Sequence, residues 1–596
     1  MKELEYPFDC DWIMSKKRSL KKKLKKEMEE RRSGVIKKRI AILGGSTTAD
    51  IKDCLELFLL NESIEPEFYE SEYNQYYQDI MFPNSELESF QPDLIYIHTS
   101  NRNITDYPEV CDSVEQIEGK LESVYQQFET LWGKADNLYH CPIIQNNMEL
   151  PFYRLLGNRD VSDYHGRVNF IGRLNEKFYQ YARNHEGFYI NDINYLSACY
   201  GLDKWADPFY WYMYKYSLCV PAIPVLSANI AKIIKALYGK NKKAFALDLD
   251  NTLWGGIVGD DGPDNLEIGQ ETSIGQAYSE FQKYIREHRS MGILLNVCSK
   301  NEEENAVAGL NHQDGILKPD DFIVIRANWE PKSKNILEVA GELNIMPDSL
   351  VFVDDNPAER EIVRQQVAGA AVPELSSVEH YIQEIDRHGY FEVVNLSKDD
   401  LERNKMYKDN VERARLVAAY ENYEDYLLSL KMRAVIKPFE TVYMSRIAQL
   451  TNRSNQFNLT TKRYSQEEIE EAATDGKRVT LYGKLEDRFG DNGVVSVVIG
   501  RLEGTVCHIE LWLMSCRVLK RDMEFAMMDA LVSRLRKHNI KEIIGYYYPT
   551  AKNAMVRNFY GQHGFTKVSD NADGNTVWSM TIESYENRNK VIEVEE

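Results

Sequence analysis

The sequence has 596 residues, about four typical domain lengths, so a single compact core is excluded. Hydrophobic residues make up 43% and charged residues 28%, as in soluble globular proteins, which excludes disordered and collagen-like chains. The formal net charge of −21 predicts a surface that repels nucleic acid and anionic lipid, so we expect no nucleic-acid partner.

The positions of the cysteines and of the apolar residues exclude further classes of protein. The nine cysteines are scattered without a Cys-x-x-Cys pair, which excludes a disulfide framework and a cysteine-based zinc site. No window of about 18 residues is continuously apolar, since even 219–234 contains Pro221, Pro224 and Lys232. We therefore expect a soluble cytoplasmic protein, with no secretory signal and no membrane-spanning segment.

A basic segment opposes the overall charge. Between Lys16 and Arg32, ten Lys or Arg residues stand against three Glu residues. Leu20, Leu24 and Met28 recur every four residues, which predicts an amphipathic helix. This helix either covers the first domain with its charged face in solvent or docks on an acidic partner.

Alternating strand and helix patterns divide the rest of the chain. Buried strands are predicted at 38–43 and 93–98, and again at 244–250, 292–298 and 349–355, each followed by polar residues. A later region has strands first and then a long helix at 523–538, which indicates a mixed α/β fold. We expect a multidomain α/β protein: a basic helix over 1–38, a parallel α/β domain over 39–238, a doubly wound parallel sheet over 239–394, and a helical linker with a mixed α/β domain over 395–590.

Acidic residues gather where the central strands end. Asp248 and Asp250 follow one strand and Asp354 and Asp355 follow another, and ligands of parallel sheets bind at these carboxyl ends. Such a cluster of carboxylates suits Mg²⁺. Lys332 and the hydroxyl of Ser299 can neutralise and hydrogen-bond a phosphate there, so the pattern predicts phosphoryl transfer.

These four motifs resemble those of the haloacid-dehalogenase-like (HAD) phosphatases: Asp248-Leu-Asp-Asn-Thr-Leu, Ser299, Lys332 and Val351-Phe-Val-Asp-Asp-Asn-Pro. The resemblance implies a Rossmann-like domain in which Asp248 attacks phosphorus while Asp250 protonates the leaving oxygen and then activates water. It also implies that Thr252 and Ser299 hold the phosphoryl group and that Lys332 offsets its charge. Magnesium ligands would be Asp248, the Asp250 carbonyl, and either Asp354 or Asp355.

A narrower resemblance, to the FkbH-like subfamily, lies in Leu253-Trp-Gly-Gly-Ile-Val-Gly-Asp-Asp-Gly, Cys298-Ser-Lys-Asn, Asn328-Trp-Glu-Pro-Lys and Val353-Asp-Asp-Asn-Pro-Ala-Glu-Arg. Members of that subfamily act in polyketide and surface-polysaccharide biosynthesis. The resemblance implies removal of phosphate from 1,3-bisphosphoglycerate and transfer of the glyceryl group, through a thioester on Cys298, to an acyl carrier protein. The alternative for Cys298 is an inert core residue.

The first domain resembles the SGNH-hydrolase-like, flavodoxin-type region of the same subfamily. Its Gly44-Gly-Ser-Thr turn makes Ser46 the candidate nucleophile, with Gly45, Asn101 or Asn103 as oxyanion donors. The DxxH segment of that family corresponds to Asp192-Ile-Asn-Tyr, where Tyr195 replaces the histidine base. We therefore expect a binding or docking domain.

The last unit resembles GNAT acyltransferases, with Asn553 and Tyr560 at positions that contact pantetheine or protonate the leaving thiolate in that family. In the loop from Arg517, Lys520 and Asp522 replace the small residues that let backbone amides bind the CoA pyrophosphate. Binding of free acetyl-CoA is therefore not expected, whereas a pantetheine arm fits.

Three functions remain open. The first is a Mg²⁺-dependent enzyme that dephosphorylates an acyl donor and passes the acyl group to an acyl carrier protein. The second is a plain phosphomonoesterase acting on a sugar phosphate, which needs Asp248 but not Cys298. The third is a non-catalytic assembly subunit that binds a carrier protein. Gaps of about 25 and 32 residues after Asp250 and Ser299 leave no room for a large cap domain, which favours a protein-borne substrate.

Overall fold

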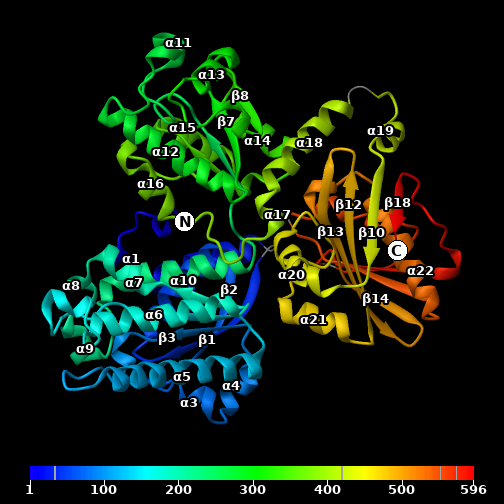
Figure 1. Ribbon diagram of the computed structural model, residues 1–596. Coiled ribbons are helices and arrows are strands. Elements are labelled where there is room, and N and C mark those ends of the chain that lie inside the picture. Colours follow the sequence, from blue (N-terminus) through cyan, green and yellow to red (C-terminus); the bar gives the residue numbers. More distant parts are fainter. Residues whose placement is uncertain (32–34, 418–419, 551, 572, 596) are drawn as a thin grey trace. The chain divides into compact units, whose positions relative to one another are not determined.

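The computed structural model describes residues 1–31, 35–417, 420–550, 552–571 and 573–595, so Arg32 of the predicted basic helix lies outside the described residues. The chain forms two compact units, Met1–Lys235 and Ala236–Glu596. The first unit contains one parallel sheet, and the second contains a parallel sheet followed by a mixed sheet (Figure 1).

The sheet of the first unit has five strands in the order β2-β1-β3-β4-β5, all parallel. This is the flavodoxin-type order, in which the chain reverses direction beside β1 and β3. Side chains of β1 alternate, so Ala41 and Leu43 pack into the core under the long helices α5 and α6. The elements are β1 (Ile36–Gly44), α2 (Ala49–Asn61), β2 (Ile64–Glu70), α3 (Gln78–Met81), α4 (Ser85–Phe90), β3 (Leu94–His98), α5 (Val114–Tyr139), β4 (Ile143–Asn146), α6 (Arg167–Asn184), β5 (Phe188–Asn191), α7 (Ile193–Tyr200), α8 (Leu202–Trp205), α9 (Pro208–Tyr214) and α10 (Ile223–Leu237).

The basic segment forms helix α1 (Cys10–Arg31), which packs on α2 of the same unit. Leu20, Leu24 and Met28 are buried as a stripe. Lysines of α1 pair with acids of α2, including Lys21 with Glu56 at 2.5 Å. The acidic surface that this helix meets is therefore the neighbouring helix of its own domain.

Among the described residues, one stretch is long and apolar enough to cross a membrane by length and composition, Val220–Leu237. The fold buries 67% of it. Ser227 within it donates a hydrogen bond to the carbonyl of Ile51 in α2, at 3.2 Å. The stretch thus has the packing of a core helix.

The central sheet has four parallel strands in the order β8-β7-β6-β9. Odd-numbered residues of β6, such as Phe245 and Leu247, pack under α12 and α16, whereas Ala244 and Ala246 pack under α14 and α15. Helices thus cover both faces, as the alternating pattern predicts. The elements are β6 (Ala244–Leu247), α11 (Val258–Asp261), α12 (Ser273–Ser290), β7 (Leu294–Ser299), α13 (Glu303–Leu310), β8 (Val324–Ala327), α14 (Lys332–Glu342), β9 (Leu350–Val353), α15 (Pro357–Gln366) and α16 (Val378–Asp386).

The last sheet belongs to the predicted mixed α/β domain, in the order β16-β17-β15-β14-β13-β12-β10-β18, with β11 added to β14. Helix α22 covers one face, and α20 and α21 cover the other. The elements are α17 (Lys398–Leu401), α18 (Arg403–Val417), α19 (Tyr423–Ser429), β10 (Met432–Lys437), α20 (Met444–Arg453), β11 (Phe457–Asn458), α21 (Gln466–Thr474), β12 (Arg478–Asp487), β13 (Gly490–Glu503), β14 (Val506–Met514), α22 (Met523–Lys537), β15 (Glu542–Tyr547), α23 (Phe559–Gln562), β16 (Thr566–Asp570), β17 (Thr576–Thr581) and β18 (Ile592–Glu595).

Candidate active site

The central domain gathers its predicted site residues at the carboxyl edge of the parallel sheet. Asp248 follows β6, and its backbone amide donates to the carbonyl of Val353 at the end of β9, at 2.9 Å. Asp354 follows β9, and Lys332 opens α14 after β8. Neighbouring parallel strands end at one edge, so residues more than 100 positions apart converge there.

Lys332 lies between two buried carboxylates. Its ammonium nitrogen is 2.9 Å from Asp248 Oδ2 and 2.6 Å from Asp354 Oδ2. Burial alone would lower the pKa of Lys332, but the two negative charges raise it above its ordinary value. Lys332 is therefore a fixed cation at the point where a phosphoryl group would approach Asp248.

Three carboxylates come together as a group of hard oxygen donors. Oxygens of Asp248, Asp354 and Asp355 all lie within 4.8 Å of one another. Burial, and then the charge of Asp248, raise the pKa of Asp354 to about 6, against the opposing effect of Lys332. One lysine does not neutralise three carboxylates, and this donor set and charge excess fit Mg²⁺.

Asp354 and Asp355 differ in how their oxygens are engaged. Asp354 accepts from Lys332 at Oδ2 and from the Asn356 amide at Oδ1, 2.9 Å away. Asp355 is partly exposed, and its contact with the Thr252 hydroxyl is long, at 3.4 Å. The Asp355 carboxylate is therefore the freer of the two to take a metal ion.

Asp250 is held by three donors. Its Oδ1 accepts from Trp254 Nε1 at 2.9 Å and from the Val258 amide at 3.1 Å, and its Oδ2 accepts from Asn301 Nδ2 at 2.7 Å. Burial raises the pKa of Asp250 despite these donors. A carboxyl group fixed in direction and readily protonated suits proton transfer.

Thr252 and Ser299 lie at the same edge. Both are buried, and Thr252 Oγ1 accepts from the Asp355 amide at 3.1 Å, which ties the turn after β6 to the turn after β9. The carbonyl of Ser299 accepts from the Asn328 amide at 3.2 Å. These contacts place both hydroxyl residues in the loops that surround the acidic cluster.

Arg360 is a site residue that sequence reasoning missed. It is buried in α15, and its guanidinium donates to the backbone carbonyls of Asp354 and Asp355, both at 2.7 Å. It also reaches the carbonyl of Leu375 at 3.3 Å. The Asp-Asp-Asn-Pro-Ala-Glu-Arg spacing in the sequence was the available signal, because it puts this arginine one helical turn beyond the acids.

Cys298 lies at the end of β7 beside the acidic cluster, but its side chain is buried in the core. Adjacent strand residues face opposite sides of a sheet, and Cys298 packs among apolar residues of the face under α14. It is fully buried, and its sulfur lies 3.6 Å from the carbonyl of Lys332. Burial raises the pKa of this thiol well above its ordinary value. In this arrangement Cys298 has the surroundings of a core residue, not those of an acyl acceptor.

Known proteins show the same organisation. The model of the FkbH N-terminal domain matches residues 39–235. The crystal structure of the N-terminal part of BF1531 from Bacteroides fragilis, which contains a phosphatase domain complexed with Mg, is 30% identical. It aligns over 64% of this chain and 99% of that chain with a TM-score of 0.59. The chain belongs to the FkbH-like family. Its central domain is a HAD-like phosphatase domain.

Other similarities concern the last domain of the FkbH-like chain. The ribosomal-protein-S18-alanine N-acetyltransferase from Escherichia coli is 13% identical and aligns over 25% of this chain and 94% of that one, with a TM-score of 0.20. Spermidine N-acetyltransferase from Vibrio cholerae, in complex with CoA and spermine, is 13% identical over 26% of this chain and 98% of that one, with a TM-score of 0.21. No curated protein matches the sequence.

In the first domain of this FkbH-like protein, Ser46 is buried and donates to the hydroxyl of Ser217 at 3.3 Å. Ser217 in turn lies 3.2 Å from Nε2 of His98, a histidine that sequence reasoning missed. Burial lowers the pKa of His98 to about 4, so the imidazole is neutral at pH 7. Asp192 caps α7 by accepting from the amide of Tyr195 at 3.0 Å, and Tyr195 is exposed.

The predicted oxyanion donors are engaged within the fold. The Gly45 amide donates to the carbonyl of His98 at 2.8 Å, and Asn103 Nδ2 donates to the carbonyl of Gly45 at 2.9 Å. Asn101 Nδ2 donates to the carbonyl of Glu149 at 3.3 Å. These contacts leave no converging donors beside Ser46 among these three residues.

In the last domain, β14 and β15 pair over only three residues, and residues 457–459 fill the space where they diverge. The amide of Leu459 donates to the carbonyl of Trp512 at 3.0 Å, and the amide of Tyr548 donates to the carbonyl of Leu459 at 2.9 Å. Asn553 is buried and donates to the carbonyl of Asn458 at 2.9 Å.

Tyr560 is also inside the core, 1% exposed, and burial raises its pKa. Asn553 is thus hydrogen-bonded within the chain, whereas the Tyr560 hydroxyl is buried without a hydrogen-bond partner among the described residues. Lys520 and Asp522 both adopt the left-handed backbone conformation that favours glycine, with φ of 63° and 59°. The loop thus keeps a glycine-like course while carrying side chains.

Proposed function

We propose that this FkbH-like enzyme dephosphorylates a phosphorylated acyl donor, a glyceryl unit carried by 1,3-bisphosphoglycerate, and passes the acyl group to the thiol of an acyl carrier protein. The observation that carries the phosphatase part is the placement of Lys332 between Asp248 and Asp354, beside Asp355. The transfer part rests on the family resemblance and on the chemistry of the donor.

In the proposed phosphatase reaction, each of three site residues has its own role. Asp248 attacks phosphorus, the bond from phosphorus to the ester oxygen breaks, and Asp250 gives its proton to that oxygen. Asp250, now a base, takes a proton from water as the water oxygen attacks the aspartyl-phosphate, which releases inorganic phosphate and restores Asp248. Lys332 offsets the charge on the phosphoryl oxygens throughout.

A magnesium ion at Asp248, the Asp250 carbonyl and Asp355 would supply a Lewis acid for the phosphoryl oxygens. We assign the third ligand to Asp355 because both oxygens of Asp354 already accept hydrogen bonds. Arg360 holds the backbone of both acids, so it positions this ligand without touching the substrate.

Acyl transfer in this proposal proceeds by attack of the carrier thiol on the acyl carbon. The bond from that carbon to the phosphate oxygen breaks, inorganic phosphate leaves, and the thiol proton passes to solvent. Direct transfer is supported by the burial of Cys298, which raises the pKa of its thiol well above the ordinary value and disfavours the thiolate. The same burial favours a second candidate, a phosphomonoesterase that hydrolyses its substrate without a carrier.

An exposed tryptophan beside the site supports a protein-borne acceptor. Trp329 lies three residues before Lys332 and is 69% exposed, an unusual exposure for this residue type. Its Nε1 donates to Glu302 at 2.6 Å, at the start of α13, so the indole is fixed in place. Fixed exposed aromatic side chains are typical anchors of protein interfaces.

Intact-mass analysis of a phosphopantetheinyl carrier tests the proposal. With Mg²⁺ and 1,3-bisphosphoglycerate, the wild-type chain should add a glyceryl group to the carrier and release phosphate. Asp248→Asn should abolish release of the ester phosphate, whereas Asp264→Asn, in the same domain, should not. Phosphate release without any carrier adduct would leave the phosphomonoesterase as the function.

A further inference from the structure

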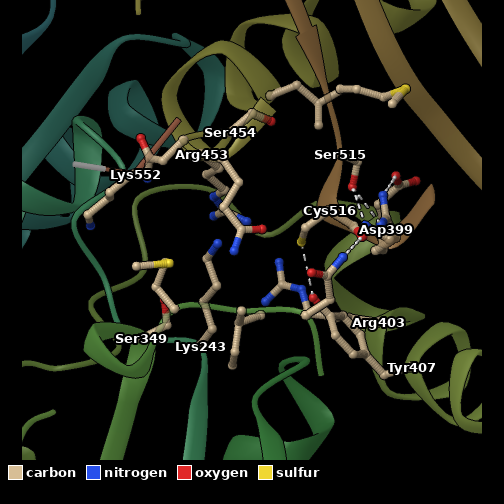
Figure 2. Close-up of a pocket in the computed structure, with 18 of the residues that line it drawn as sticks. Lys243, Ser349, Asp399, Arg403, Tyr407, Arg453, Ser454, Ser515, Cys516 and Lys552 are labelled. Carbon is tan, nitrogen blue, oxygen red and sulfur yellow. Dashed lines mark hydrogen bonds and ion pairs between the residues drawn. The ribbon is translucent and has the colours of Figure 1, made fainter. Parts of the chain in front are cut away.

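A pocket lies in the unit formed by residues 236–596, at the opposite end of the central sheet from the acidic cluster. Lys243 precedes β6 and Asp248 follows it, so about 16 Å of extended chain separates the two residues. The pocket lies where the amino ends of β6 and β9 face α18, α20 and the end of β14 (Figure 2).

The pocket is strongly basic in a chain whose net charge is −21. We call it the basic pocket. Its lining includes two carboxylates, Asp348 and Asp399, and six cationic side chains: Lys243, Arg403, Arg446, Arg453, Arg517 and Lys552.

Three carboxylates neutralise only part of this charge. Asp399 lies 2.9 Å from Arg446 Nε and 3.4 Å from Arg517 Nη2, so it is shared. Asp400, just behind the lining, is likewise shared between Arg403 and Arg453, the latter at 2.5 Å.

Asp348 pairs with Lys552, and no carboxylate among the described residues lies within ion-pair distance of Lys243. Six cations against Asp348, Asp399 and Asp400 leave an excess of three positive charges. Burial and the crowding of positive charges lower the pKa values of two of these side chains. Burial, and then the charges of Arg517 and Arg453, lower the pKa of Arg446 to about 9, and burial lowers that of Lys243.

The remaining lining is suited to an organic anion. Ser454 and Ser515 offer hydroxyl groups, while Ile345, Met346 and Leu450 provide apolar surface. Guanidinium groups bind phosphate through paired N–H donors, and an excess of three charges matches a phosphate or pyrophosphate ester better than a carboxylate.

We propose that the basic pocket binds a small phosphate or pyrophosphate ester, with Lys243 as its uncompensated cation and the arginines as its phosphate donors. This site goes beyond the phosphatase reaction, since it lies at the other end of β6. Cys516 lines the pocket and reports on its occupancy, because its sulfur is 3.5 Å from the Tyr407 hydroxyl in the pocket wall (Figure 2).

Inorganic pyrophosphate in buffer with EDTA is the probe, because no turnover occurs without Mg²⁺. Titration calorimetry of the full chain should show saturable binding that weakens with salt. Lys243→Gln should weaken binding about tenfold or more, Lys243→Arg should retain it, and Lys283→Gln, an exposed lysine of α12 outside the lining, should leave it unchanged.

Alkylation of cysteine side chains provides an independent test of binding to the basic pocket. Pyrophosphate should slow alkylation of Cys516 in peptide maps and leave the exposed Cys111 unaffected. The Lys243→Gln chain should keep its phosphatase activity and lose this protection. Lack of saturable binding, equal affinity of Lys243→Gln and Lys283→Gln, or an unchanged rate for Cys516 would each overturn the proposal.

Discussion

The ammonium group of Lys332 bridges two buried carboxylates, at 2.6 Å from Asp354 and 2.9 Å from Asp248. The side chain of Asp354 is fully buried, so its charge depends on this lysine for compensation. Removing one member of such a group leaves uncompensated buried charge. Lys332 therefore couples the stability of the central domain to its reaction.

Lys332→Met should lower the turnover number about a hundredfold or more, because the charge that faces the phosphoryl group is lost. It should also destabilise the chain by about 3 kcal/mol, since Asp248 and Asp354 then repel each other in a buried site. Thermal melts and phosphate release measure the two effects. Lys334→Met, at an exposed position two residues later, is the control and should behave as wild type.

The two acids after β9 should respond differently to substitution. Asp355→Asn should raise the Mg²⁺ concentration for half-maximal activity, because the freer carboxylate is removed. Asp354→Asn should instead act mainly through Lys332, lowering the turnover number with a smaller change in Mg²⁺ dependence. A magnesium titration of phosphate release distinguishes them, and an identical Mg²⁺ dependence in both variants would contradict the assignment to Asp355.

Cys298 offers a direct contrast with other cysteines. We expect Cys298→Ala to release phosphate at close to the wild-type rate, at a stability cost of about 1 kcal/mol from the lost packing. In the native chain, alkylation should modify the exposed Cys111 and Cys199 well before the fully buried Cys298. Rapid labelling of Cys298, or loss of carrier loading in Cys298→Ala, would restore the thioester route.

The raised pKa of Glu149 predicts that the stability of the first domain depends on pH. Burial raises the pKa of this carboxyl group from 4.5 to about 7, against hydrogen bonds that include one from the Asn101 amide. Between these values the folded state binds more protons than the unfolded state, so stability falls as pH rises through this window. Glu149→Gln should remove this loss and raise stability at pH 8 by up to about 3 kcal/mol.

Hydrogen exchange of peptides covering residues 94–146, measured at pH 5 and pH 8 after correction for intrinsic rates, checks this expectation. Glu67→Gln, at an exposed position of β2, is the control and should leave the pH dependence unchanged. Equal protection of the wild-type and Glu149→Gln chains at pH 8 would contradict it.

Ligands bind at the carboxyl ends of parallel strands, and from this rule the sequence predicted that Asp248, Lys332 and Asp354 lie close together. The structure places them together. The rule did not decide how deeply each side chain is buried, and Cys298 packs with the apolar residues under α14. The motifs also could not predict contacts between residues that are far apart in the sequence. The proximity of Ser46 to Ser217 joins residues 171 positions apart, and no local pattern marks it.

The last domain shows a similar limit. The motifs of an acyltransferase predicted a pantetheine contact for Asn553, but residues 457–459 insert beside β14, and Asn553 donates to the carbonyl of Asn458 instead. A short segment of two or three residues has no periodicity by which sequence could assign it to a strand. The sequence also did not predict the basic pocket, because its cations come from separate segments between 243 and 552.

The central claim is that Asp248 carries the phosphoryl group, and trapping the phosphorylated wild-type chain by rapid acid quench during turnover tests it most directly. Incubation with Mg²⁺ and 1,3-bisphosphoglycerate, acid quench and peptide mapping should locate one phosphate on Asp248. Asp248→Asn should show none. A phosphate on another residue, or hydrolysis by Asp248→Asn at the wild-type rate, would contradict the account.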